Sequence, residues 1–431
     1  MNGLLTDLYE LTMAAGYFAA GKQNDIGTFE FSIRHLPRNR EFVLTAGLHR
    51  AVEYLLNLSF TAEEIAYLRG LENFGNAPAR FWDYLAEFRF TGDVFAVPEG
   101  TLLYAGQPVM NVRAPLIEAQ IPETYLLSAI TFETLIATKA ARVTHAAQGR
   151  DVIEFGTRRA HTPEAGVLGA RAAFIGGCAG TSNALAGFRF GIPVMGTAAH
   201  SWVLSFETET EAFRQLQRLL GDNTVQLIDT YDTLEAARTA ARMGRPLWGV
   251  RLDSGDVAGL SREVRRILDG AGMRDVKIMA SGDLDETKIA ALVAAGAPID
   301  AFGVGSELAT SADAPTMGAI YKLVEIQQGD RVRHTAKNSP DKQTLPGGKQ
   351  LFRFPDYDLL GLHHECAGGS EAMLKPLVIG GRLVEALPSV AAIRGRAQAA
   401  LAEWPSGPRH TGHSLALKKL DEEMRSVNVP A

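Results

Sequence analysis

The chain has 431 residues, 46% hydrophobic and 21% charged, which excludes a largely disordered protein and predicts two or three domains at about 150 residues each. Its formal net charge of −6 gives no electrostatic basis for nucleic acid as a general partner. The two cysteines, Cys178 and Cys366, exclude a disulfide framework and a cysteine-rich metal site.

The N-terminal segment does not have the pattern of a secretion signal. It lacks a basic stretch, and Asp7 and Glu10 interrupt its apolar residues. No apolar run in the chain reaches the roughly 18 residues of a membrane helix. We therefore expect a cytoplasmic protein that does not enter a membrane.

The first 150 residues mix predicted helices and strands without regular alternation. Helical spacing of apolar residues predicts helices over 5–20, 47–58, 61–70 and 118–147. Thr61 and Glu64 form a capping box at the start of the third of these. Alternating apolar residues predict a strand over 27–34, and short β-rich runs follow over 93–113. We predict an α+β domain over 1–150.

From residue 151 onward, short apolar strands alternate with helical patterns. The predicted strands are 152–155, 194–197, 225–229, 248–253, 277–281 and 301–305. The predicted helices between them are 207–220, 232–243, 257–271 and 285–296. This alternation predicts a parallel sheet. A further strand over 319–326 leads into a polar, basic stretch at 331–353, and a hairpin at 377–385 with helices at 389–402 and 414–425 completes the pattern.

Polar or glycine-rich residues follow each of the six strands. In an open doubly wound sheet only the topological switch point collects functional groups, whereas in a barrel every strand's carboxyl end faces one site. We therefore predict an α/β fold in which an irregular or incomplete (β/α) barrel over 151–353 carries the catalytic site. Residues 354–431 are expected to complete the first domain.

The residues at these strand ends are suited to phosphate chemistry. Gly282, Gly303 and Gly305 follow strands, where glycine lets backbone N–H groups approach an anion. The cations that could neutralise phosphates are Arg158, Arg251, Lys337 and Lys342, and the carboxylates that could hold Mg²⁺ or ribose hydroxyls are Asp229, Asp253 and Asp256. Fingerprints of P-loops, dinucleotide folds, nucleophile elbows and zinc sites are incomplete or missing.

Seven segments, in order, resemble those of the nicotinate phosphoribosyltransferase family. They are Thr6–Met13, Phe29–Phe31, Phe155–Ala160, Gly196–Trp202, Val250–Asp256, Gly303–Gly305 and Lys342–Gly347. Together they make the resemblance specific over about residues 4–353, and beyond 354 it fades.

The resemblance implies a type II phosphoribosyltransferase fold that works as a homodimer with shared active sites. It implies transfer of the phosphoribosyl group of phosphoribosyl pyrophosphate (PRPP) to nicotinate, giving nicotinate mononucleotide and pyrophosphate with Mg²⁺. It also implies that ATP hydrolysis is coupled through a phosphorylated histidine, which is His200 in this sequence. From one histidine alone, a hydrogen-bonded structural role would be the usual interpretation.

The resemblance also implies roles for the other candidate residues. Asp229 and Asp253 are expected to be catalytic, with Mg²⁺ held mainly through pyrophosphate. The expected nicotinate-binding residues are Tyr9 (from the partner subunit), Phe155, Arg158, Ser182, Asn183 and Arg251. The expected PRPP-binding residues are Asp256, Gly282, Gly303, Gly305, Lys337 and Lys342. Asp256 or Ser254 would alternatively cap the helix at 257–271. Which arginine holds the nicotinate carboxylate stays open.

Four other functions compete with this interpretation. Nicotinamide phosphoribosyltransferase differs only in its substrate, and neutral Ser182 and Asn183 favour the carboxylate of nicotinate. Quinolinate phosphoribosyltransferase fits less well because its chain is shorter and lacks the His200 segment. A Schiff-base lyase would need a lysine at a strand end, but Lys277 begins its strand. A catalytically silent binding paralogue would not need the histidine and both aspartates.

Overall fold

The structure is a computed structural model that describes residues 3–339, 342–404 and 409–427. The chain divides into two compact units. Unit 1 comprises 1–134, 316–388 and 402–431, and unit 2 comprises 135–315 and 389–401. The division differs from the predicted one in three segments. Residues 135–150 and 389–401 belong to unit 2, and residues 316–353 belong to unit 1 because strand β12 there pairs with β1 near the N-terminus.

Unit 1 is built on sheets whose strand pairs are antiparallel, except that β15 (Asp358–Leu362) pairs in parallel with β19 (Thr411–His413). Its described helices are α1 (Leu8–Ala19), α2 (Leu48–Asn57), α3 (Ala62–Arg69), α4 (Ala79–Ala86), α5 (Leu116–Gln120) and α16 (Leu415–Val427). The largest sheet has the order β13 (Arg331–His334), β12 (Gly318–Gln328), β1 (Ile26–His35), β5 (Pro108–Pro115), β3 (Asp93–Ala96), β17 (Lys375–Ile379) and β18 (Arg382–Leu383). A second sheet has the order β16 (Glu371–Ala372), β14 (Lys349–Arg353), β15 (Asp358–Leu362) and β19 (Thr411–His413). A small one pairs β2 (Val43–Leu44) with β4 (Leu102–Leu103).

Local sequence signals account for several of these elements. The predicted capping box begins α3: Glu64 N–H donates to Thr61 Oγ1 at 3.1 Å, and Thr61 N–H donates to Glu64 Oε2 at 2.7 Å. The predicted hairpin forms as β17 and β18. A buried core that includes Phe31, Val94 and Val112 lies between the large sheet and α2. Helix α6 (Glu123–Ala146) carries the chain from unit 1 into unit 2.

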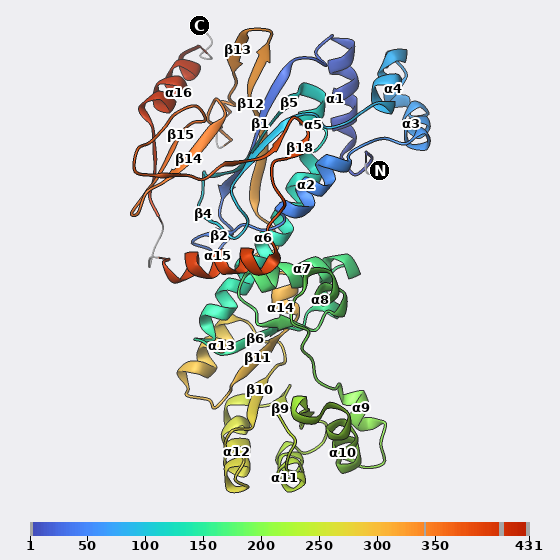
Figure 1. Cartoon of the computed structure of the whole chain (residues 1–431), viewed down its shortest axis with the longest axis vertical. Coiled ribbons are helices and arrows are strands. Elements are labelled where there is room, and N and C mark those ends of the chain that lie inside the picture. Colours follow the sequence, from blue (N-terminus) through green and yellow to red (C-terminus); the bar gives the residue numbers. More distant parts are fainter. Residues whose placement is uncertain (1–2, 340–341, 405–408, 428–431) are drawn as a thin grey trace. The chain divides into compact units, whose positions relative to one another are not determined.

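Unit 2 contains a parallel sheet with helices between its strands (Figure 1). Among the described residues the sheet has the order β7 (Gly180–Thr181), β6 (Asp151–Glu154), β11 (Ala301–Val304), β10 (Lys277–Ala280), β9 (Gly249–Leu252) and β8 (Val225–Leu227). The helices of this unit are α7 (Pro163–Ile175), α8 (Ala184–Phe190), α9 (His200–Leu204), α10 (Glu209–Leu220), α11 (Thr233–Met243), α12 (Val257–Gly270), α13 (Glu286–Ala294), α14 (Ser306–Ala309) and α15 (Val390–Ala402).

The sheet of unit 2 is a partial barrel, as predicted. Among the described strands, β7 pairs only with β6 and β8 only with β9, so the strand order does not close. Helices α10, α11 and α12 bury Phe213, Ala236 and Val264 with the strand residues Val250 and Ile278 in one apolar cluster. This packing fixes β9 and β10 against these helices.

The predicted strand over 194–197 is wrong. Only Val194 forms an isolated bridge, to Thr181, and the two-residue strand β7 takes the place beside β6. Pro193 lacks an N–H donor, and Gly196 follows closely, so the segment cannot sustain a ladder. The chain from 195 to 199 is instead a loop, and His200 begins α9.

None of the helices in the described residues is long and apolar enough to cross a membrane.

Candidate functional site

Two neighbouring cavities lie at the carboxyl ends of the unit 2 strands. The first, of about 250 Å³, is lined by residues at or just after the carboxyl ends of β6, β7, β8 and β9 and by the 196–200 segment. The second, of about 230 Å³, is lined by residues that follow β10 and β11. Phe155, Arg158, Arg251 and Asp253 line both, so the two cavities form the halves of one site.

Arg251 is the central cation of this site. Its guanidinium donates from Nε to Ser281 Oγ at 2.8 Å, from Nη1 to Thr197 Oγ1 at 2.6 Å and from Nη2 to Asp253 Oδ1 at 2.8 Å. Its Cζ also lies 5.7 Å from the centroid of the Phe155 ring. These contacts come from the ends of β9 and β10 and from the 195–199 loop, and they hold the planar group in one orientation beside an aromatic face.

Asp253 is kept ionised by its neighbours. Burial on its own would raise the pKa of Asp253, but the hydrogen bonds from Arg251 and Ser281 and the charge of Arg251 outweigh burial and hold the pKa below its usual value. Ser281 Oγ donates to Asp253 Oδ1 at 2.5 Å. The other carboxylate oxygen, Oδ2, lies 3.9 Å from His200 Nε2. Asp253 therefore presents a negative charge to the first cavity.

Asp229 brings a second carboxylate to the same place. Its Oδ2 accepts from the backbone N–H of Asp253 at 3.0 Å and from Ser254 Oγ at 2.6 Å. Its Oδ1 is buried without a hydrogen-bond partner among the described residues and lies 3.9 Å from His200 Nε2. His200 Nδ1 lies 3.2 Å from Thr230 Oγ1, and the ring is 42% exposed. The predicted catalytic trio of His200, Asp229 and Asp253 is thus assembled in the structure.

At two strand ends, neighbouring atoms lie so close that only glycine, which has no Cβ, fits. Gly282 has φ of +91°, and a Cβ there would lie 2.0 Å from the carbonyl oxygen of Asp253. A Cβ on Gly303 would lie 2.5 Å from the Phe155 ring. Gly305 lines the second cavity with both of them, together with Asp283 and Ser306. Backbone therefore forms much of the second cavity's wall, which suits an anionic group.

The remaining predicted residues divide into two groups. Arg158, which is exposed, and Ser182 line the first cavity. Asn183 does not, because its Oδ1 caps α8 at Ala186 N–H and its Nδ2 donates to Thr157 Oγ1 at 3.1 Å. Asp256 caps α12 by accepting from Gly259 N–H at 3.1 Å, which is the alternative role considered for it.

Three predicted residues, Tyr9, Lys337 and Lys342, belong to unit 1. Tyr9 is on α1 and 47% exposed. Lys337 and Lys342 lie between β13 and β14, where Thr344 Oγ1 accepts from the Lys337 N–H at 2.9 Å. Residues 340–341 of this stretch are outside the described part of the chain.

The hydroxyl residues that hydrogen-bond to the charged groups were not among the predicted site residues. Thr197 and Ser281 hold the Arg251 guanidinium, and Thr230 contacts His200. Thr157 lines the first cavity. Each of these residues stands within a few residues of a strand end or of His200. Only this position could have marked them as site residues, because serine and threonine are common in turns and their residue type alone indicates no function.

Comparison with known sequences places both parts of the chain in one family. The NAPRTase N-terminal domain model, for nicotinate phosphoribosyltransferase, matches residues 4–131, and the quinolinate phosphoribosyl transferase C-terminal domain model matches 136–314. A nicotinate phosphoribosyltransferase of Mycobacterium tuberculosis is 43% identical over 395 residues, covering 89% of this chain and 83% of the relative. That of Bacillus subtilis is 44% identical over 359 residues, covering 81% of this chain and 72% of the relative.

Solved structures agree with the sequence comparison. Human nicotinic acid phosphoribosyltransferase superposes with a TM-score of 0.82 at 28% identity, covering 97% of this chain and 99% of the human one. A nicotinate-nucleotide pyrophosphorylase from Pyrococcus furiosus gives a TM-score of 0.75 at 26% identity, covering 93% and 95%. The quinolinate-type model matches only the second part, whereas the full-length relatives span both units. By its sequence and its fold, this chain belongs to the nicotinate phosphoribosyltransferase family.

Proposed function

We propose that the protein transfers the phosphoribosyl group of PRPP to nicotinate, forming nicotinate mononucleotide and pyrophosphate with coupled ATP hydrolysis. The observation that carries the proposal is the meeting of Asp229, Asp253 and His200 beside a cavity lined by Phe155 and Arg251. The names of the similar proteins support the substrate and the reaction.

The first cavity suits an aromatic carboxylate. A pyridine ring that stacks on Phe155 brings its carboxylate close to Arg251, whose Cζ lies 5.7 Å from the centroid of that ring. Arg251 Nη1 donates to Thr197 Oγ1 and, at a long 3.5 Å that a substrate carboxylate could replace, to the Ala198 carbonyl oxygen. Nη2 donates one N–H to Asp253 and keeps a second one. A guanidinium recognises a carboxylate through two such parallel N–H groups. We therefore assign the nicotinate carboxylate to Arg251, with Arg158 at the rim.

The transfer needs positioning and charge more than proton movement. The nitrogen lone pair of nicotinate forms the bond to ribose C1 while the C1–O bond breaks, and pyrophosphate leaves with the electron pair. No base is required, because the attacking nitrogen carries no proton. The carboxylates of Asp229 and Asp253 stabilise the positive charge that develops on the ribose, and the glycine-lined second cavity holds the 5-phosphate.

The two aspartates also fit Mg²⁺. Asp229 Oδ1 is buried and without a hydrogen-bond partner in the described residues, and Asp253 Oδ2 faces the same space. Carboxylate oxygens are the ligands that Mg²⁺ prefers, usually together with phosphates of the substrate. When bound, Mg²⁺ would supply positive charge to the departing pyrophosphate.

ATP coupling is assigned to His200. An imidazole nitrogen attacks the γ-phosphorus of ATP, an N–P bond forms, the P–O bond to ADP breaks, and water later cleaves the N–P bond to release phosphate. The phosphoryl group adds about −1.5 to −2 charges, as it does on other phosphorylated side chains. The added charge would lie beside Asp229 and Asp253, so it changes the electrostatics of the PRPP site. The basic stretch over 331–345 is proposed to respond by binding pyrophosphate through Lys337 and Lys342.

A homodimer is proposed from the surface of α1 and of the residues just before it. Leu5, Leu8, Tyr9 and Met13 are apolar or aromatic and at least 36% exposed. Exposed side chains of this kind close together on one segment are typical of an interface. In the dimer, Tyr9 is proposed to stack on the nicotinate bound by the partner subunit. Light scattering that finds a monomer at assay concentrations would remove this part of the proposal.

The function is tested by measuring mononucleotide formation from labelled nicotinate with PRPP and Mg²⁺, with and without ATP, and from labelled nicotinamide in parallel. We expect product from nicotinate and a faster rate with ATP. Product from nicotinamide alone would overturn the substrate assignment and keep the reaction. No product from either substrate would favour a silent binding paralogue.

Substitution of Arg251 by lysine is expected to raise KM for nicotinate by more than about tenfold, since paired hydrogen bonds to a charged group contribute about 1.5–3 kcal/mol. Lysine keeps the charge but cannot bridge Thr197, Ser281 and Asp253 together. Steady-state kinetics against both substrates gives the measurement. Arg266→Lys, which changes an exposed arginine on α12 that pairs with Glu263, is the matched control. A KM that rises for PRPP and not for nicotinate would reassign Arg251 to the phosphates.

A further inference from the structure

A chain of hydrogen bonds starts at the buried carboxylate of Glu154, next to the residues that line the first cavity of unit 2. Glu154 is the last residue of β6, is 2% exposed and directly precedes Phe155. Its Oε1 accepts from the backbone N–H of Gly156, and its Oε2 accepts from Thr181 Oγ1. The carboxylate therefore joins the turn that follows β6 to the end of β7.

The hydrogen bonds continue into the turn that follows β7. The Thr181 hydroxyl, which donates to Glu154, also accepts from the backbone N–H of Asn183 at 3.0 Å. Asn183 Nδ2 donates to Thr157 Oγ1 at 3.1 Å, which leads back to the turn that follows β6. The N–H of Ser182 donates to the Glu154 carbonyl oxygen at 2.9 Å. The two turns are thus linked by both side-chain and backbone hydrogen bonds.

The two linked turns form part of the wall of the first cavity. Phe155 lines both cavities, whereas Thr157 and Ser182 line the first. Glu154 and Thr181 lie behind this wall and are 2% and 0% exposed. They therefore act on the cavity through the residues that they hold. A shift of either turn would displace Thr157 and Ser182, which lie around the proposed nicotinate position.

The carboxylate supplies something that an apolar side chain at position 154 could not. Burial raises the pKa of Glu154, and the hydrogen bonds from Thr181 and Gly156 oppose this rise. Burying a carboxylate costs free energy that burying an apolar side chain does not. In return, its two acceptor oxygens bind donors from two different turns at once.

We propose that Glu154 and Thr181 are positioning residues for nicotinate. They hold the turns after β6 and β7 in the arrangement in which Phe155, Thr157 and Ser182 enclose the pyridine ring. This inference rests on the proposed function, because it takes the first cavity as the nicotinate site. Neither positioning residue reaches the reacting atoms, so their loss acts on nicotinate binding and leaves PRPP binding nearly unchanged.

The test compares Thr181→Val with Thr181→Ser in steady-state kinetics of the full-length enzyme. Valine has the shape of threonine but can neither donate to Glu154 nor accept from Asn183, whereas serine can do both. We expect Thr181→Val to raise KM for nicotinate by about 10- to 100-fold, because a displacement of about 1 Å in a site costs up to about 10²-fold. KM for PRPP should stay nearly unchanged, and Thr181→Ser should behave as the wild type.

Glu154→Gln should raise the same KM, because glutamine offers one acceptor oxygen where glutamate offers two. Combined with Thr181→Val, it should add little, as expected for two partners of one hydrogen bond. Glu118→Gln is the matched control: Glu118 is a buried carboxylate of unit 1 that also accepts from a backbone N–H and a threonine hydroxyl, both of Thr91. It should lower the melting temperature and keep both KM values.

The outcomes distinguish the positioning role from the proposed function. A wild type that makes no mononucleotide from nicotinate would overturn the proposed function and the positioning role with it. An active wild type whose KM for nicotinate is unchanged in both Thr181→Val and Glu154→Gln would overturn the positioning role alone. So would a KM that rises equally for both substrates, or that rises in Glu118→Gln as well. Should Thr181→Val not fold, Glu154→Gln is judged by the same criteria.

Discussion

Asp229→Asn is expected to lower kcat/KM for nicotinate mononucleotide formation by about 10²–10³-fold, the usual loss when one preorganised electrostatic group is removed from an active site. Asparagine keeps the size of the side chain and an oxygen that can accept from Asp253 N–H and Ser254 Oγ. It removes the negative charge that Oδ1 directs toward His200 and the proposed ribose position. The loss should therefore fall on the chemical step while the fold is retained.

The measurement is steady-state kinetics of the purified variant together with its thermal unfolding. Asp232→Asn is the matched control, since Asp232 is three residues away and its Oδ1 caps α11 at Leu234 and Glu235 N–H. Asparagine caps helices about as well as aspartate, so this variant should keep both activity and stability. An Asp229→Asn enzyme with near-normal kcat/KM would show that the charge has no part in catalysis.

His200→Ala is expected to abolish stimulation by ATP and to leave slow transfer from PRPP. Alanine removes the only nitrogen nucleophile that the structure places between Asp229 and Asp253 among the described residues, while Phe155, Arg251 and both carboxylates stay in place. The variant should therefore still bind and position nicotinate and PRPP, but it should no longer couple their reaction to ATP hydrolysis.

Two measurements distinguish the loss of histidine phosphorylation from a general loss of activity. Initial rates are measured with and without ATP, and label from [γ-³²P]ATP is followed into the protein. The wild type should become labelled and His200→Ala should not. His161→Ala, which removes an exposed imidazole elsewhere in unit 2, should be labelled and stimulated normally. Full ATP coupling in His200→Ala would disprove the phosphohistidine role.

Local patterns predicted most elements because they depend on neighbouring residues. Short-range geometry accounts for three of them: the capping box of Thr61 and Glu64, the hairpin of β17 and β18, and the βα alternation from β8 to β11. The strand over 194–197 failed because its apolar residues do not show that β7 competes for the place beside β6. Strand β12 was predicted, but its pairing with β1 was not, because a periodic pattern contains no information about its partner.

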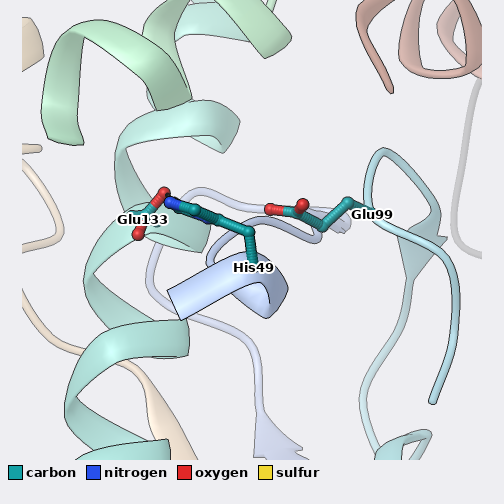
Figure 2. A group of neighbouring side chains, drawn as sticks. All are labelled: His49, Glu99 and Glu133. Carbon is teal, nitrogen blue, oxygen red and sulfur yellow. Dashed lines mark ion pairs between the residues drawn. The ribbon is translucent and has the colours of Figure 1, made fainter. Parts of the chain in front are cut away.

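The sequence by itself determined the class of fold, the family and the residue types at the strand ends, since these depend on periodicity and on motifs read in order. Only the tertiary structure decided which of them act together. It joined Arg251 to Thr197 and Ser281, set Asp229 beside His200, and showed that Asn183 and Asp256 cap helices. It also assembled His49, Glu99 and Glu133 of unit 1, which no spacing along the chain connects (Figure 2). Such contacts form between side chains far apart in sequence, whose distances are set by packing.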